Sequence, residues 1–173
     1  MKKPLGFREL ADFLVKAKKE SWAGGAKETL QWGIKNIEPF ISQAGSLTLC
    51  YVDNYADSGR NVFQGLEVVS RIDGSLHIWE PVWAMSYRGQ YLGIEKEKEA
   101  VNDVLKQALK AVPVDAPFRG PHVHKFDKYS YTNSYGGDIK EFHGVEEIVL
   151  RGKQVRGEVK RVHELKYFGG LTK

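Results

Sequence analysis

Two short runs of the sequence alternate tyrosine with a carboxylate or an amide. The first run contains Tyr51, Asp53 and Tyr55, and the second contains Tyr129, Tyr131, Asn133 and Tyr135. Alternate residues of a strand point to the same face, so each run would gather phenols around one polar group. We expect such a face either to line a polar cavity that binds a small molecule, or to form a solvent-facing strand surface with paired tyrosines.

Two glutamates offer a second chemistry. Glu67 and Glu146 each stand two residues after a glycine, and Arg119 lies in a stretch flanked by prolines. A guanidinium can hold a carboxylate through two parallel hydrogen bonds, so we favour a structural ion pair between Arg119 and these glutamates. The alternative is an enzyme in which Asp53, Glu67 and Glu146 act as acid and base.

A third group alternates apolar side chains, namely Trp83, Met85 and Tyr87. Core packing is the simpler interpretation, and the wall of an apolar pocket is the other. Of this group, we include Trp83 and Tyr87 in the candidate binding site. We also include Arg119 and Tyr135.

The histidines do not predict a metal site. His122 and His124 would share one strand face, but their spacing to the other three histidines matches no specific zinc pattern. No glycine-rich phosphate loop, nucleophile elbow or His-Glu-x-x-His motif is present. We therefore expect neither a metal nor a cofactor, and we lean away from an enzyme.

Two helices are expected to support these side chains. Apolar residues recur at helical spacing over 7–20 and over 101–112. Gly24 and Gly25 after the first segment, and Pro113 after the second, are expected to end the helices. Lys16, Lys18 and Lys19 are expected on the solvent side of the first helix. Each helix has one apolar stripe, which predicts packing on a sheet.

Strands are expected between and after the helices. Period-two, β-branched and aromatic segments predict strands at 47–55, 63–72, 77–87, 129–135, 142–150 and 159–168. The segment 27–40 mixes helical spacing with Trp32-Gly33 and Glu38-Pro39, so we expect it to be irregular.

The strand motifs repeat along the chain. Residues of one type recur 79 or 80 positions apart at Tyr51/Tyr131, Phe63/Phe142, Glu67/Glu146, Tyr87/Tyr167 and Gly89/Gly169. This spacing predicts one domain over 1–173 made of two pseudo-repeats, about 5–92 and 93–173. Each would be a helix followed by an antiparallel meander, α-βββ, in an α+β fold. The helices would pack on a curved antiparallel sheet or a barrel-like pair of sheets, with a cleft on the pseudo-twofold axis.

Bulk properties limit the other classes. The chain has 173 residues and one cysteine, Cys50, which fits a buried thiol in a reducing cytoplasm. The net charge of +4 is spread over diluted basic stretches, so nucleic acid is not the expected partner. No apolar run approaches a membrane span or a signal core, and we expect a soluble cytoplasmic protein.

The same segments resemble a bacterial and archaeal family catalogued as a domain of unknown function. The resemblance lies at 10–19, 22–25, 51–55, 63–69, 81–89, 117–121 and 167–170. It implies no catalytic residues. Some relatives carry a helix-turn-helix domain, which implies an effector-binding role. We expect no helix-turn-helix domain before the first helix, so DNA recognition is not expected.

Three functions remain open from the sequence. The first is a non-catalytic module that binds a small-molecule effector in the cleft. The second is the enzyme described above. The third is a protein-interaction domain that forms a homodimer through a sheet edge or exposed aromatic residues.

Overall fold

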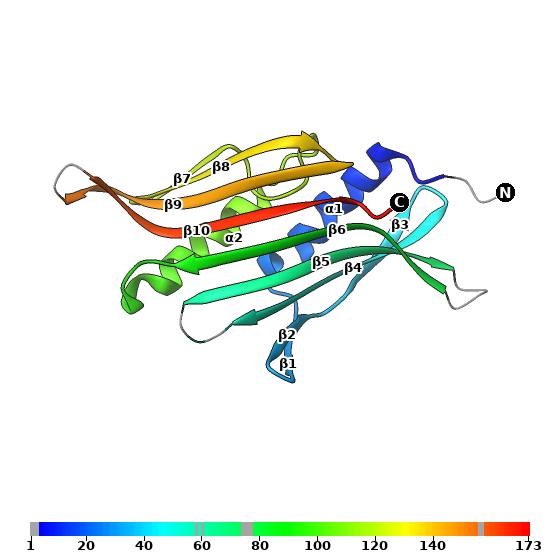
Figure 1. Ribbon diagram of the computed structural model, residues 1–173, viewed down its shortest axis with the longest axis horizontal. Helices are drawn as coiled ribbons and strands as arrows, with labels where there is room; N and C mark the ends of the chain where they lie inside the picture. Colours follow the sequence, from blue (N-terminus) through cyan, green and yellow to red (C-terminus); the bar gives the residue numbers. More distant parts are fainter. Residues whose placement is uncertain (1–3, 58, 60, 74–77, 156–157) are drawn as a thin grey trace.

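The computed structural model describes residues 4–57, 59, 61–73, 78–155 and 158–173. Within them the chain forms two α-helices and a large antiparallel sheet (Figure 1). The helices are α1 (Phe7–Glu20) and α2 (Lys98–Lys110), and two short 3₁₀ turns are η1 (Trp22–Gly24) and η2 (Glu95–Glu97). The strands before α2 are β1 (Glu28–Gln31), β2 (Ile34–Ile37), β3 (Phe40–Ala44), β4 (Leu47–Asp57), β5 (Val62–Asp73) and β6 (Ile78–Tyr91). Those after α2 are β7 (Val123–Phe126), β8 (Tyr129–Asp138), β9 (Glu141–Val155) and β10 (Glu158–Leu171).

The sheet joins two meanders through their last strands. Its order is β1-β2-β4-β5-β6-β10-β9-β8-β7, and β3 pairs with β4 beside β2. At the junction β6 and β10 are antiparallel, with Tyr87 opposite Tyr167. The sheet is open, so the expected barrel-like pair of sheets is wrong. The α+β class and the antiparallel sheet are confirmed.

Both helices were predicted correctly in type and nearly in extent. Leu10 and Leu14 of α1 are fully buried, as are Val104 and Ala108 of α2. These residues cover one face of the sheet, behind the strands as drawn in Figure 1. Among the described helices, neither is both long and apolar enough to cross a bilayer.

The prediction that 27–40 is irregular is wrong. This segment forms the β1–β2 hairpin and the start of β3. Trp32 and Gly33 occupy the turn with φ of 55° and 79°. Two consecutive residues with positive φ allow a two-residue hairpin turn to match the twist of its strands. This turn interrupts the period-two pattern of the sequence, and the hairpin was therefore not expected. Within the described residues, six strands precede α2 and four follow it, in place of the expected three each.

The tyrosines of the two alternating runs lie on the covered face of the sheet. Tyr51 and Tyr131 are 2% and 0% exposed, which excludes the solvent-facing alternative for them. The hydroxyl of Tyr87 donates to Asp53 at 2.8 Å, and that of Tyr167 donates to Asn133 at 2.9 Å. The two meanders therefore contain the same tyrosine-to-polar contact.

A glycine makes room for each of these tyrosines. Gly65 pairs with Tyr87, and Gly144 pairs with Tyr167. A methyl group at Gly144 would overlap the Tyr167 phenol. Close approach of a side chain to the backbone, not a special φ, explains the glycine here.

Gly144→Ala is expected to lower the free energy of unfolding by about 1–3 kcal/mol, because it displaces Tyr167 from Asn133 in a packed interior. Urea denaturation measures the change. Gly136→Ala is the matched control on β8, where the added methyl meets only the ring of exposed His143. Equal, small effects of the two substitutions would show that the Tyr167 contact is not tightly packed.

Candidate functional site

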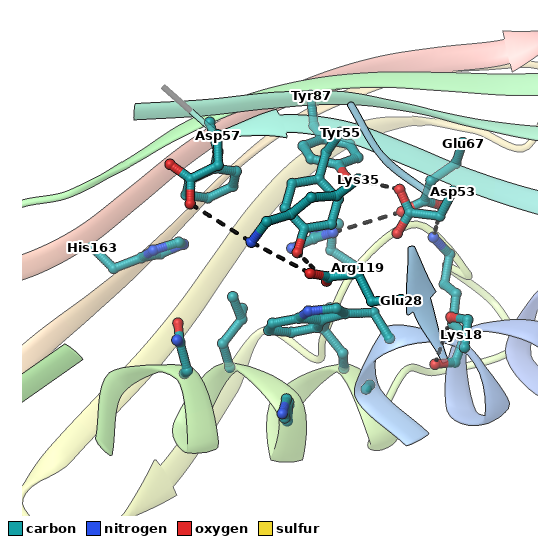
Figure 2. A pocket seen from close by; sticks show the side chains of 18 of the residues that line it. Lys18, Glu28, Lys35, Asp53, Tyr55, Asp57, Glu67, Tyr87, Arg119 and His163 are labelled. Carbon is teal, nitrogen blue, oxygen red and sulfur yellow. Dashed lines mark hydrogen bonds and ion pairs between the residues drawn. The ribbon is translucent and has the colours of Figure 1, made fainter. Parts of the chain in front are cut away.

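A cavity of about 300 Å³ lies between the sheet and the helices. In Figure 2 the strands form one side, and α2 with the end of α1 forms the other. Apolar side chains line both sides, with Phe63 and Tyr91 on the strands and Leu105 and Leu109 on α2. One end is charged and contains Lys18, Asp53, Glu67 and Arg119. The volume suits a small organic molecule.

The structure brings together part of the predicted site. Tyr51, Asp53, Tyr55, Tyr87 and Arg119 all line the cavity.

The remaining predicted residues lie elsewhere. Tyr131 and Asn133 belong to the buried network around Glu146 and Tyr167. Trp83 packs in the core against Phe142, and Tyr135 stacks on His122. The cavity is therefore lined mainly by the first meander and the helices, and is not shared equally between the two runs.

Asp53 is the carboxylate at the charged end that is held by a phenol. It is 8% exposed on β4 and accepts its hydrogen bond from Tyr87. Burial, and then the negative charge of Glu67, raise the pKa of Asp53 to about 7. Near neutral pH this side chain can therefore both donate and accept a proton.

Glu67 sits between two cations. The ammonium of Lys18 contacts one of its oxygens, and Arg119 Nη1 lies 3.7 Å from the other. Lys18 is only 4% exposed, and burial lowers its pKa although Glu67 opposes the shift. The expectation that Lys18 faces solvent is wrong.

Glu146 is bound more completely and does not line the cavity. Arg119 donates to both of its oxygens, at 3.0 and 2.7 Å, and Tyr131 donates at 2.9 Å. Nε2 of His163 lies 3.3 Å away. Burial alone would raise the pKa of Glu146, but Arg119 and then His163 outweigh it and lower that pKa below its ordinary value. Glu146 therefore stays ionised and cannot serve as an acid.

The mouth of the cavity is crossed by a polar network from the β1–β2 hairpin. Lys35 Nζ lies 3.4 Å from Glu28 and 4.0 Å from Asp57, and the Tyr55 hydroxyl donates to Glu28 at 2.5 Å (Figure 2). The Lys35 ammonium also lies over the Tyr55 ring. These contacts hold the hairpin against the end of β4.

Sequence reasoning missed much of the lining of this site, including Lys18, Glu28, Lys35 and His163. A signal existed for Lys18, since it follows the buried Leu14 by four positions and so lies on the apolar stripe of α1. No comparable signal marked Glu28 or Lys35, because their hairpin was not recognised.

His122 does not line the cavity. His122 stacks on Tyr135 with centroids 4.5 Å apart, and its Nδ1 lies 2.9 Å from the Asn133 carbonyl. Within the part of the chain that the structure describes, no three His, Cys, Asp or Glu side chains are grouped to hold a metal ion.

Comparison with known proteins gives a family and no activity. The model of a domain of unknown function (DUF5680) matches residues 53–172, which run from within β4 through α2 to the end of β10. No curated protein and no solved structure matches the chain.

Proposed function

Since the chain belongs to this family of domains of unknown function, DUF5680, we propose from its own cavity that it is a non-catalytic module that binds a small amphipathic molecule. The observation that carries the proposal is the pairing inside the cavity. Glu67 is neutralised by Lys18 and Arg119, whereas Asp53 accepts from a tyrosine. A buried carboxylate that accepts a phenol hydrogen bond, with Lys18 and Arg119 near it but paired with the glutamates, is a costly arrangement for stability alone.

The cavity suits a ligand with a polar end and an apolar body. A hydroxyl or amine on the ligand would donate to Asp53, and a ring or branched chain would pack against Phe63, Tyr91 and Leu105. Few polar groups at one end of an apolar wall fix the orientation of a ligand and set its specificity. The ligand in this proposal is an effector, not a substrate.

Binding can be tested with two probes that differ in one group. Benzyl alcohol carries a ring and a donor, and toluene carries the ring alone. We expect the alcohol to shift amide resonances of β4, β6 and α2 in ¹H–¹⁵N spectra and to bind more tightly than toluene. Native mass spectrometry of the purified protein tests in parallel for a co-purified molecule.

Asp53→Asn is expected to weaken benzyl alcohol binding by a factor of about 10 to 150, because one charge-assisted hydrogen bond contributes roughly 1.5–3 kcal/mol. Asp103→Asn is the matched control, since Asp103 is exposed on α2 and does not line the cavity. Equal affinity for toluene and the alcohol, or equal loss in both variants, would contradict a ligand held by Asp53.

One observation favours an enzyme as a second candidate. The pKa of Asp53 at about 7 is suited to a general acid or base near neutral pH. Glu146 is bound by Arg119 and does not line the cavity, which leaves Asp53, with Glu67 beside it, as the acid-base carboxylates of that hypothesis. Turnover lost in Asp53→Asn, with binding retained, would distinguish this candidate from a binding module.

We also propose that the two meanders arose by duplication. The equivalent contacts of Tyr87 with Asp53 and of Tyr167 with Asn133 support this, as do the glycines beneath both tyrosines. Asn133 would then be the uncharged counterpart of Asp53. In this proposal only the first copy kept the carboxylate and the cavity.

A further inference from the structure

Lys18 occupies an unusual position for an amine. It lies in the last turn of α1, is 4% exposed, and nevertheless lines the cavity. Its ammonium lies 5.7 Å from the ring centroids of both Tyr51 and Trp83. The Glu67 carboxylate contacts it directly (Figure 2). The side chain therefore presents its amine to the cavity from a fixed, largely water-excluded position.

Lys18 is the cation that directly contacts Glu67, since both oxygens of Glu146 hold Arg119. Arg119 already lies 3.7 Å from Glu67, and it is also buried. A second buried cation adds its own desolvation cost, which is several kcal/mol for an unpaired ion. An arginine stays charged, so Lys18 is the one of these two cations that can become a neutral nucleophile, and it lines the cavity.

We propose that Lys18 forms a reversible imine with an aldehyde or ketone held in the cavity. This rests on the proposed function, with one change: the polar end of the ligand is a carbonyl group, and the Asp53 carboxyl group donates to its oxygen. A lysine in a low-dielectric pocket is the residue type that does this chemistry, because desolvation favours the neutral, nucleophilic amine.

The neighbouring carboxyl groups supply the proton transfers for addition. Glu67 takes a proton from the Lys18 ammonium, and the neutral nitrogen then forms a bond to the carbonyl carbon. The electron pair of the C=O double bond moves to oxygen, which takes a proton from the Asp53 carboxyl group. The nitrogen returns one proton to Asp53, and a neutral carbinolamine results.

Loss of water completes the balance. The carbinolamine hydroxyl takes the proton held by Glu67 and leaves as water, while the nitrogen lone pair forms the C=N bond. The product is a protonated imine, so one positive charge is present before and after. Glu67 then pairs with the iminium as it did with the ammonium, and the Tyr51 and Trp83 rings remain beside that charge.

The electrostatics agree with these roles. Burial lowers the pKa of Lys18, which raises the share of free amine. The pKa of Asp53 at about 7 leaves part of this group protonated at neutral pH. Glu67 is placed to accept the first proton because it is in contact with the ammonium.

The test uses benzaldehyde with sodium cyanoborohydride at pH 7, followed by peptide mapping of the benzylated lysines. We expect Lys18 to be modified faster than Lys19, since the cavity holds the aldehyde beside Lys18 and burial raises the share of its neutral amine. Lys19 is the internal control because it is exposed in the same turn of α1. Lys18→Arg should abolish the fast phase while keeping the charge, and Lys19→Arg should not.

Modification of Lys18 no faster than that of Lys19 would overturn the imine. Mapping of the unsubstituted protein gives this result even where Lys18→Arg does not fold. Benzyl alcohol separates the two proposals. If it binds but Lys18 is not trapped, the imine is wrong and the binding module stands. If it does not bind and Lys18 is not trapped, both are wrong.

Discussion

Arg119→Met is expected to lower the free energy of unfolding by about 3–5 kcal/mol, the loss typical of removing one partner from a buried ion pair. Arg119 is 6% exposed and donates to both oxygens of Glu146 while it lies beside Glu67. Methionine keeps most of the side-chain volume but leaves Glu146 without its two charged hydrogen bonds. Urea denaturation monitored by tryptophan fluorescence measures the change.

Arg8→Met is the control for this substitution. Arg8 pairs with Asp12 on the surface of α1, where the two side chains are 74% and 56% exposed. Such a pair contributes little, so the change should stay within about 0.5 kcal/mol. Adding Glu146→Gln to Arg119→Met should recover part of the loss, because it removes the uncompensated charge. If Arg119→Met lowers the free energy of unfolding by less than about 1 kcal/mol, Tyr131 and His163 alone are enough to stabilise the buried Glu146 carboxylate.

Asp53→Asn is expected to stabilise the protein at alkaline pH and to change how its stability depends on pH. The pKa of Asp53 is about 7 in the folded protein, against an ordinary value of 3.8. The folded state therefore binds the proton more tightly than the unfolded state does. The stabilisation that the proton provides is fully present below pH 3.8 and is lost as pH rises to about 7, by up to about 4 kcal/mol.

Asparagine cannot ionise, so the variant does not suffer this loss. The unfolding free energy of Asp53→Asn minus that of the unsubstituted protein should rise between pH 4 and pH 8 and level off above it. An amide fits this kind of contact, since Asn133 accepts a hydrogen bond from the Tyr167 hydroxyl as Asp53 does from Tyr87. Asp103→Asn, at an exposed position on α2, should give a flat difference. Parallel pH profiles for Asp53→Asn and the unsubstituted protein would contradict a raised pKa.

A stabilising substitution inside the cavity would bear on function as well. Groups that reduce stability persist where activity needs them, because selection maintains function above a stability threshold. If Asp53→Asn gains stability at pH 8 and loses affinity for benzyl alcohol, the carboxylate is retained for binding. If it gains stability and loses no binding, the site proposed here is not at Asp53.

Local patterns in the sequence determined the helices and most of the strands. Leu10, Leu14, Val104 and Ala108 stand at helical spacing and are buried, because 3.6 residues per turn bring them to one face. The alternation of Tyr51, Asp53 and Tyr55 likewise predicted one shared face. These predictions depend only on the geometry of each backbone segment, which a sequence carries within itself.

Other local predictions failed where a turn concealed the pattern. The β1–β2 hairpin was not expected, and with it Glu28 and Lys35 at the mouth of the cavity were missed. The connection between the strands expected at 63–72 and 77–87 falls partly outside the described residues, at 74–77.

Only the tertiary structure decided which of the predicted residues share a cavity. Lys18 meets Glu67 across 49 positions of sequence, and Tyr87 meets Asp53 across 34. Packing of α1 on the sheet sets the first contact, and strand pairing sets the second, as it sets the junction of β6 with β10. Whether a carboxylate is neutralised by a cation, like Glu67, or held by a phenol, like Asp53, depends on which distant side chain the packing brings within hydrogen-bond distance. Because desolvation and pairing act through space, the alternation of residue types along a strand does not determine them.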